Sequence, residues 1–403
     1  MAPLHKYFFP DNESFAYEAL RAASYAYCGG AELAEVISIC SRIQSKDEDS
    51  WLREWKLAGD RAVETAKTSL AKNNRRGAQS AFLRASNYYR TAEFYRRDNV
   101  FEDKLSKELM KLSTEAFYSA TELMPYRTEK VKIPYEGTTL PATIMQPDKS
   151  DTPIPTIIFN GGFDSTREEV FYMNGQAALD QGFNIILFDG PGQGEALREQ
   201  RLFFRNDWET VITSVVDFAL DQPIVIKDKL FLMGISMGGY LVGRALCFEH
   251  RCAAAIVNDG VYDFGSAFHN QNPALGRFLI QNGWDATINA LMRQMMRWDT
   301  GFKWAISNGM WAFGVQSPVD VLRCVKGYTL EGLVNNIKTP LLVLDATEDH
   351  FLKGQPKELF DRLLCKKEFE HFTEEEGATA HCHMGSLSRL NQAIFDYLLP
   401  RAR

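Results

Sequence analysis

The chain has 403 residues, of which 45% are hydrophobic and 12% aromatic, so it can build a large core and lies outside the composition of disordered proteins. Its 45 Lys and Arg residues against 52 Asp and Glu residues give a net charge of −7, which argues against a nucleic-acid partner because such proteins need a concentrated basic surface. No apolar run approaches the roughly 18 residues of a membrane span, so we expect no membrane association.

The cysteines and the N-terminus indicate a cytoplasmic protein. The seven cysteines are unevenly spaced and include no Cys-x-x-Cys pair, which is typical of reduced thiols. The first residues lack the basic stretch and apolar block of a signal peptide.

Residues 1–127 have apolar residues at helical spacing and no strand-like alternation. Trp51, Trp55 and Ala62 illustrate this spacing. We therefore expect residues 1–127 to form a helical N-terminal domain.

From residue 128 onward, short apolar segments alternate with amphipathic ones. The first two segments form a hairpin across the turn at Glu136 and Gly137. The expected strands cover residues 130–135, 140–145, 154–159, 184–188, 230–233, 253–257, 341–344 and 369–372. The expected helices lie near residues 167–181, 205–220, 238–249, 354–365 and 386–398. Strands that are apolar throughout and separated by helices predict an α/β fold, with a mostly parallel sheet covered on both faces.

One segment, residues 261–335, breaks this alternation. Its pattern is helical, and it contains four of the seven tryptophans. We interpret it as a helical cap inserted between two core strands, so that the core comprises residues 128–260 and 336–403. Most of its large apolar residues would attach the cap to the core. A few, among them Trp311, are expected to line a pocket.

A Gly-x-Ser-x-Gly motif at residues 234–238 lies between an expected strand and an expected helix. Such a turn pushes the hydroxyl of Ser236 away from the backbone, and it needs small residues on both sides because strand and helix approach closely. The motif in this context predicts Ser236 as a nucleophile, which requires a base to remove its proton.

The acid and the base should follow Ser236 in chain order. The strand at 340–344 leads to Asp345, Glu348 and Asp349. Asp345 still lies in the strand register and is expected to be structural, whereas Asp349 lies in the loop where the acid belongs, with Glu348 as the alternative.

The base is expected in the loop after the last strand, where His381 and His383 both occur. We favour His381 because it comes first on the loop, and His383 is the alternative. No cluster of His, Cys and Asp has the spacing of metal ligands, so we expect neither a metal nor a cofactor.

Two backbone amides are needed to stabilise an oxyanion. The first is expected from Met237, the residue after the nucleophile. The second is expected from Gly162 or Phe163, in the loop after the third strand. At the end of this loop, Thr166 and Glu169 have the spacing of a capping box, so we expect them to be structural.

Other polar residues at strand ends are candidate substrate contacts. The glycine-rich segment 189–195 lacks the Gly-x-Gly-x-x-Gly pattern of a phosphate-binding loop, so we expect a tight structural loop in which Glu195 could face the substrate. Asp259, Tyr262 and Asp263 lie between a core strand and the cap, and one of them could contact polar groups of the substrate.

The motifs at 234–239, 188–195, 162–169 and 380–385 together resemble one branch of the α/β-hydrolase superfamily. This branch contains fungal secondary-metabolite hydrolases of the hydroxy-prefusarin hydrolase type, and the yellowish-green heptaketide and dihydroxypseudooxynicotine hydrolases are more distant relatives. Segments such as Asp49-Ser50-Trp51 extend the resemblance over nearly the whole chain.

The resemblance implies that Ser236 is the nucleophile, Asp349 the orienting acid and His381 the base. It also implies that the N-terminal helical domain covers the active site as a lid, together with the cap. The family includes enzymes that cleave carbon–carbon bonds, hydrolyse esters or close rings. The additional carboxylate that some carbon–carbon hydrolases use has no clear counterpart here.

The sequence therefore favours a serine hydrolase of secondary metabolism that acts, through an acyl-enzyme, on a bulky small molecule of polyketide or polyketide–peptide type. The alternatives are a carbon–carbon hydrolase of β-diketo chains, a general carboxylesterase and a non-catalytic ligand-binding scaffold. A homodimer is possible, because two-fold dimers are the commonest oligomers.

Overall fold

The computed structural model describes residues 4–269, 280 and 282–403. Its eight strands form one sheet in the order β1-β2-β4-β3-β5-β6-β7-β8. Strands β1 and β2 form an antiparallel hairpin, β2 pairs antiparallel with β4, and the strands from β4 to β8 run parallel. The strands are β1 (Arg127–Tyr135), β2 (Thr138–Gln146), β3 (Ile154–Asn160), β4 (Asn184–Phe188), β5 (Val225–Ile235), β6 (Ala254–Asn258), β7 (Leu341–Ala346) and β8 (Lys367–Phe372).

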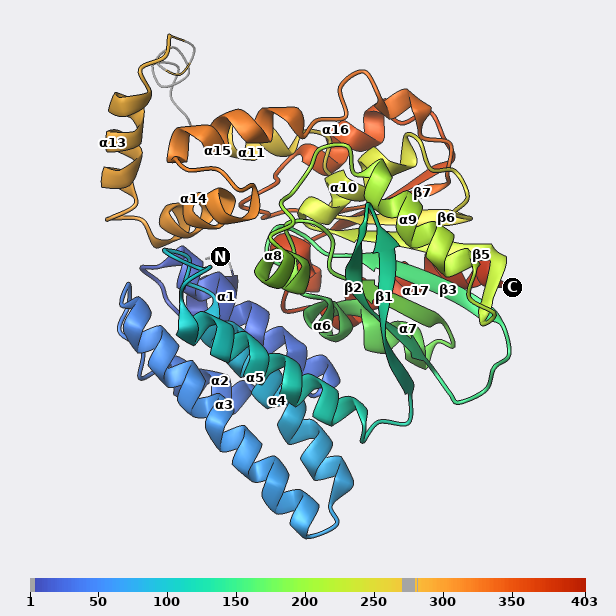
Figure 1. Cartoon of the computed structure of the whole chain (residues 1–403), viewed down its shortest axis with the longest axis horizontal. Helices are drawn as coiled ribbons and strands as arrows, with labels where there is room; N and C mark the ends of the chain where they lie inside the picture. The colour runs from blue at the N-terminus through green and yellow to red at the C-terminus, as the bar shows by residue number, and fades with distance from the viewer. Residues whose placement is uncertain (1–3, 270–279, 281) are drawn as a thin grey trace.

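Helices cover both faces of this sheet (Figure 1), so its central strands are buried on both sides. On one face, Ile158 and Leu232 pack in a core that includes α9 and α10; on the other, Ile157 and Met233 pack in a core that includes α7 and α17. The core helices are α6 (Arg167–Val170), α7 (Gln176–Asp180), α8 (Gly194–Gln200), α9 (Glu209–Leu220), α10 (Met237–Leu246), α16 (Gln355–Arg362) and α17 (Leu387–Ala402). This architecture confirms the predicted α/β-hydrolase fold.

The chain before β1 is helical in the part that the structure describes. Helix α3 begins after Asp47, whose side chain accepts hydrogen bonds from the first free backbone amides. Trp55 on this helix is buried against Tyr88 of the helix that follows, and Trp51 is buried against Tyr95 just after that helix, so both attach α3 to its neighbour. The helices are α1 (Glu13–Ser24), α2 (Leu33–Cys40), α3 (Glu48–Ala71), α4 (Arg75–Glu93) and α5 (Lys104–Thr121).

A second helical segment lies between β6 and β7 and sits above the N-terminal helices (Figure 1). The Trp304 ring stacks on Phe94 with ring centroids 4.6 Å apart, so the two helical regions contact each other directly. Residues 270–279 and 281 of the expected cap lie outside the described residues, and the domain boundaries at 127, 260 and 335 stay predictions. The described helices here are α11 (Phe264–His269), α13 (Asp285–Met295), α14 (Thr300–Ala312) and α15 (Pro318–Cys324).

Across the described ranges, no helix is long and apolar enough to cross a membrane.

Buried ion pairs attach the N-terminal helices to the loop after β3. Arg21 of α1 donates to both carboxylate oxygens of Glu169, at 2.8 and 2.7 Å, and to Asp164 at 2.9 Å. Arg90 of α4 donates to Asp164 at 2.8 Å and to Glu169 at 3.2 Å. Both arginines and Glu169 are buried, so each charge depends on its partners.

The expected capping box at the start of α6 is only half formed. The Thr166 hydroxyl accepts the Glu169 amide at 3.3 Å, as a helix cap should. The Glu169 carboxylate binds Arg21 and Arg90 instead of returning to the cap, so Glu169 is structural as expected, but through ion pairs and not through a capping box. The reason is that charge-assisted bonds to guanidinium groups are stronger than a bond to a neutral amide.

Arg21→Met should destabilise the protein strongly, because it leaves the buried carboxylate of Glu169 and the half-buried carboxylate of Asp164 with too little positive charge. We expect the free energy of unfolding in denaturant to fall by about 3 to 5 kcal/mol. Lys67→Met is the control, since Lys67 pairs with Glu64 on the surface and should contribute less than about 1 kcal/mol. Equal effects of the two substitutions would contradict the role given to the buried pairs.

Candidate functional site

Ser236 occupies the sharp turn between β5 and α10. Its backbone adopts φ 59° and ψ −126°, which is strained for a residue with a side chain. A side chain at Gly238 would begin 2.6 Å from the Asn160 carbonyl oxygen, so only glycine lets the helix approach β3 this closely. The turn therefore has the geometry that the Gly-x-Ser-x-Gly motif predicted.

Three side chains from separate strand ends form one hydrogen-bonded chain. His381 Nε2 lies 2.9 Å from Ser236 Oγ, and His381 Nδ1 lies 2.7 Å from Asp349 Oδ2. The other oxygen of Asp349 accepts the backbone amides of Phe351 and Leu352 at 2.7 and 2.9 Å, which fix the carboxylate in place. The structure thus brings together the three residues that the sequence favoured.

The alternative acid and base lie elsewhere. Glu348 accepts a hydrogen bond from the Thr379 hydroxyl at 3.0 Å, and no contact between Glu348 and His381 is found among the described residues. His383 is fully buried with its ring 4.0 Å from that of Phe372, and burial lowers its pKa to about 3. Asp345 lies 2.6 Å from His371 Nδ1 at the far edge of the sheet.

A second carboxylate also faces His381, which the sequence did not indicate. Asp259, directly after β6, places Oδ2 3.0 Å from His381 Nδ1 and is completely buried. The sequence suggested Asp259 only as one of three candidate contacts for substrate. Its position at the carboxyl end of the strand next to β7 was the one available signal, because parallel strands bring such residues to the same edge.

The two carboxyl groups have opposite pKa shifts. Burial raises the pKa of Asp259 to about 7, and the negative charge of Asp349 adds to this effect. Burial would also raise the pKa of Asp349, but the positive charge and hydrogen bond of His381 outweigh it and hold this pKa well below its usual range. Burial would lower the pKa of His381, yet the charge of Asp349 raises it well above its ordinary value. At neutral pH, Asp349 is the anion that faces the imidazole.

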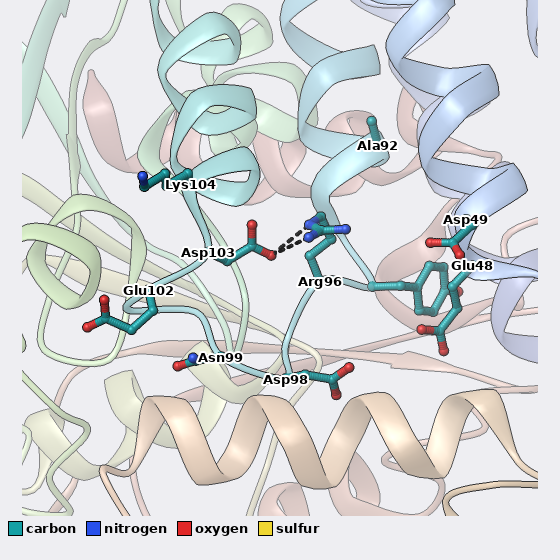
Figure 2. Close-up of a pocket in the computed structure, with 10 residues that line it drawn as sticks. Glu48, Asp49, Ala92, Arg96, Asp98, Asn99, Glu102, Asp103 and Lys104 are labelled. Atoms are coloured by element: carbon teal, nitrogen blue, oxygen red, sulfur yellow. Dashed lines mark hydrogen bonds and ion pairs between the residues drawn. The ribbon is translucent and has the colours of Figure 1, made fainter.

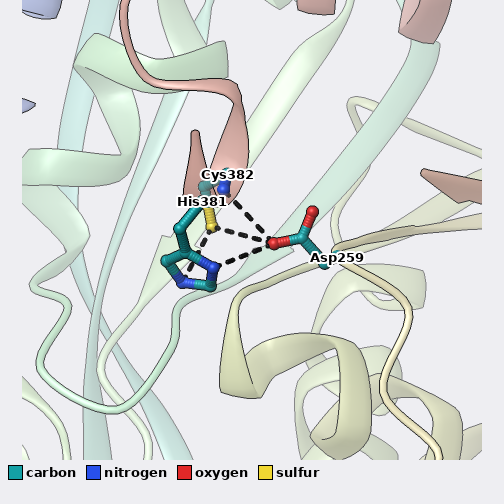
Figure 3. Close-up of side chains that lie close together, drawn as sticks. All are labelled: Asp259, His381 and Cys382. Atoms are coloured by element: carbon teal, nitrogen blue, oxygen red, sulfur yellow. Dashed lines mark hydrogen bonds and ion pairs between the residues drawn. The ribbon is translucent and has the colours of Figure 1, made fainter. Parts of the chain in front are cut away.

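Cys382 lies beside His381 and Asp259 (Figure 3). Its amide donates to Asp259 Oδ2 at 3.2 Å, and its Sγ lies 3.4 Å from His381 Nε2. Asp259, His381 and Cys382 are near enough to share a metal ion, which their spacing in the sequence did not indicate. However, both ring nitrogens of His381 already face Ser236 and the carboxylates, and burial raises the thiol pKa to about 11, which disfavours the thiolate that a metal needs. The absence of a metal stays a prediction.

The backbone amides around Ser236 differ in availability. The Gly162 amide donates to Ser165 Oγ at 2.9 Å, so it is already occupied. The amides of Phe163 and Met237 donate to no other described residue. Gly162 itself lies against Ser236, since a side chain there would begin 2.9 Å from Ser236 Cβ.

Aromatic rings surround the Phe163 side chain. The rings with centroids within 6.3 Å of it come from the core and from the helices between β6 and β7, and are Phe204, Phe264, Phe268, Trp304 and Phe313. Tyr17 of α1 lies beside His381, and its hydroxyl donates to the His381 carbonyl at 3.1 Å. Both helical regions therefore contribute to the surroundings of Ser236.

The four weaker candidates for substrate contact have partners within the protein. Glu195 pairs with Arg167 at 2.7 Å, and Tyr262 lies under Arg362 at 4.4 Å. The carboxylate of Asp263 accepts the Ser266 amide at 3.1 Å at the start of α11. Trp311 lies beneath the guanidinium groups of Arg97 and Arg198, at 5.2 and 4.6 Å. A contact of these four residues with substrate stays a prediction.

A cavity of about 490 Å³ opens at the N-terminal helices (Figure 2). Charged side chains line much of it, among them Glu48, Asp98, Glu102 and Lys104, and Arg96 pairs with Asp103 across one side at 2.7 Å. None of the residues around Ser236 named above lines this cavity. It is therefore separate from the hydrogen-bonded chain of Ser236, His381 and Asp349.

Residues 157–392 match the family model described as "Alpha/beta hydrolase family". Similar curated proteins come from fungi. The chain is 32% identical to the 20-hydroxy-prefusarin hydrolase FUS2 of Gibberella moniliformis, over 98% of this chain and 97% of the relative. It is 30% identical to the hydrolase acrC of Aspergillus aculeatus over 97% of both chains, and 31% identical to the hydrolyase poxO of Penicillium oxalicum over 89% of both chains.

Among solved structures, the 2,6-dihydroxy-pseudo-oxynicotine hydrolase superposes with a TM-score of 0.73 at 18% identity, covering 94% of this chain and 95% of that chain. AbyA5 superposes with a TM-score of 0.61 at 16% identity, covering 94% and 92%. At these identities the likeness concerns the fold alone. Together with the fungal relatives, it confirms the resemblance inferred from the motifs.

Gly162→Ala should reduce any reaction at Ser236, because the new methyl group would lie 2.8 Å from the Ile235 carbonyl oxygen and 2.9 Å from Ser236 Cβ. Ser236 must shift to relieve these contacts. A displaced nucleophile should lower the rate of Ser236 labelling by a fluorophosphonate about 100-fold. Gly301→Ala is the control, since its methyl group would meet no atom closer than 3.5 Å. Unchanged labelling of Gly162→Ala would contradict this account.

Proposed function

Because the chain belongs to the α/β-hydrolase family, we propose that it is a serine hydrolase whose catalytic triad is Ser236, His381 and Asp349. The hydrogen-bonded chain from Asp349 Oδ2 through His381 to Ser236 Oγ, with distances of 2.7 and 2.9 Å, carries this proposal. The protein is related to fungal hydrolases of secondary metabolism over almost its whole length.

In the proposed reaction, His381 Nε2 takes the proton of Ser236 while Oγ attacks a substrate carbonyl. Asp349 accepts a hydrogen bond from the Nδ1–H of His381 and stays ionised, which keeps the other ring nitrogen free as a base and stabilises the imidazolium that forms. His381 then returns the proton to the leaving group. Water, or a nucleophile within the substrate, resolves the acyl-enzyme, so that the products are an acid or a closed ring.

The amides of Met237 and Phe163 are the proposed oxyanion hole. Both are free of partners within the described chain, whereas the Gly162 amide is bound to Ser165. This observation favours Phe163 over Gly162, between which the sequence left the choice open. Preorganised backbone donors of this kind provide a large part of the rate enhancement in acyl transfer.

We propose a bulky, mostly apolar substrate of polyketide or polyketide–peptide type. The support is the group of aromatic rings around Phe163, next to the proposed oxyanion hole. Apolar walls with a few fixed polar groups are typical of sites for such ligands. The expected cytoplasmic location, the homodimer, and the absence of nucleic-acid and membrane partners stay predictions.

Labelling by a fluorophosphonate tests the triad directly. The wild-type protein should gain the mass of one adduct, measured on the intact protein, because the probe reacts with an activated serine. Ser236→Ala and His381→Ala should both lose the adduct while keeping the wild-type unfolding midpoint. A folded wild-type protein that gains no adduct would contradict a serine nucleophile and favour the non-catalytic scaffold.

The pH dependence of labelling tests the role of Asp349. The acidic limb of the rate reports the pKa of His381, which must be neutral to act as base. Because the charge of Asp349 raises this pKa, Asp349→Asn should move the limb to lower pH and lower the maximal rate by up to about 10⁴-fold.

Glu348→Gln is the matched control for Asp349→Asn, since it removes the neighbouring carboxylate that faces Thr379. Its limb and maximal rate should equal those of the wild type. If the acidic limb stays in place in Asp349→Asn, or moves in Glu348→Gln, Asp349 is not the acid that orients His381.

A further inference from the structure

The glycine-rich segment of residues 189–195, which connects β4 to α8 and includes the first two residues of α8, has no part in the reaction proposed above. It nevertheless brings one buried polar side chain, Gln193, to the loop that follows β3. Gly192 has φ +84°, and a side chain at Gly194 would overlap the Asp189 carboxylate, so the loop turns within a few residues. This tight turn leaves Gln193 only 2% exposed.

Every polar atom of the Gln193 amide group is used. Nε2 donates to the carbonyl oxygens of Gly161 and Gly162, at 2.7 and 2.9 Å. Oε1 accepts the amide of Gly190 at 3.1 Å. Since one end of the group faces two acceptors and the other faces a donor, only one orientation of the side-chain amide satisfies all three bonds.

These bonds determine which way the Phe163 amide points. In a planar trans peptide, the carbonyl of Gly162 and the amide of Phe163 point in opposite directions. Fixing the Gly162 oxygen on Gln193 therefore fixes the direction of the Phe163 N–H. The preceding peptide is held at both ends, because the Gly161 oxygen binds Gln193 and Asn160 while the Gly162 amide binds Ser165.

We propose that Gln193 is a positioning residue that keeps the Phe163 amide in the oxyanion hole, an inference that rests on the function proposed above. The consecutive glycines Gly161 and Gly162 give this segment unusual freedom, since glycine accepts conformations that other residues avoid. Without Gln193, the Gly162–Phe163 peptide can turn over and present a carbonyl oxygen where the oxyanion forms. Two negative oxygens would then face each other, which opposes the reaction.

The test compares Gln193→Met, which keeps the length of the side chain and removes its donor, with wild type. We expect the second-order rate of fluorophosphonate labelling to fall about 10² to 10³-fold, the effect of losing one oxyanion donor. If the protein hydrolyses p-nitrophenyl butyrate, kcat should fall by a similar factor and KM should change less than tenfold. Gln193→Asn keeps the amide on a shorter side chain and should give an intermediate rate.

Gln146→Met is the matched control. Gln146 is also buried and donates from its side-chain amide to a backbone carbonyl, that of Ser150 at 3.1 Å, but it lies at the opposite end of the sheet from Ser236. Its labelling rate should equal that of the wild type. A residual rate in Gln193→Met above that of Ser236→Ala is expected, because Met237 still contributes its amide.

The possible outcomes separate this inference from the proposed function. If the wild type is labelled and folded Gln193→Met is labelled at the same rate, the inference is overturned and the proposed triad stands. Loss of the folded state in both Gln193→Met and Gln193→Asn would also overturn it, since Gln193 would then serve stability. Equal fluorophosphonate labelling of wild type and Ser236→Ala would contradict the proposed function itself.

Discussion

The architecture around Ser236 depends on two buried arginines. Arg21 and Arg90 come from the N-terminal helices, and their main partners, Asp164 and Glu169, lie in the loop after β3 and at the start of α6. A buried charge without a partner costs several kcal/mol, so neither side can separate from the other without a large penalty. The N-terminal helices are therefore tied to the segment that directly follows Phe163. Because the Phe163 amide is a proposed oxyanion donor, these ion pairs both attach the N-terminal helices and help to hold one side of the proposed active site.

The same loop is held from two further directions. Gln193 binds the carbonyls before the Phe163 amide, and Asn308 of α14 donates to the Phe163 carbonyl at 3.2 Å. Asn308 is in turn bound by Arg97 at 3.0 Å. A loop that contains consecutive glycines would otherwise sample many conformations, and each of these contacts removes some of them. Rigid donors cost no reorganisation when charge develops, which is the physical basis of electrostatic stabilisation.

The environment also separates the two acids at His381. Asp349 binds two backbone amides and the imidazole, which favour its anion, whereas Asp259 is completely buried next to another carboxylate, which favours its neutral form. The pKa values of these two adjacent carboxyl groups are therefore pushed apart, with that of Asp259 raised to about 7 and that of Asp349 held well below its usual range. Asp349 is thus the acid that holds its negative charge at the imidazole, although two acids are within hydrogen-bonding distance of Nδ1.

The sequence by itself determined the α/β fold, because apolar strands alternating with amphipathic helices leave little choice of layers. It also pointed to Ser236, Asp349 and His381, since the strand–turn–helix motif and the chain order are local features. Three features were decided only by the tertiary structure: the Asp259 carboxylate at His381, the partners of Glu169, and the occupation of the Gly162 amide by Ser165. The first two join residues that are 79 to 148 positions apart, and the third depends on how one loop turns. Spacing along the chain does not encode such contacts; they arise when buried charges and amides must each find a partner as the layers pack.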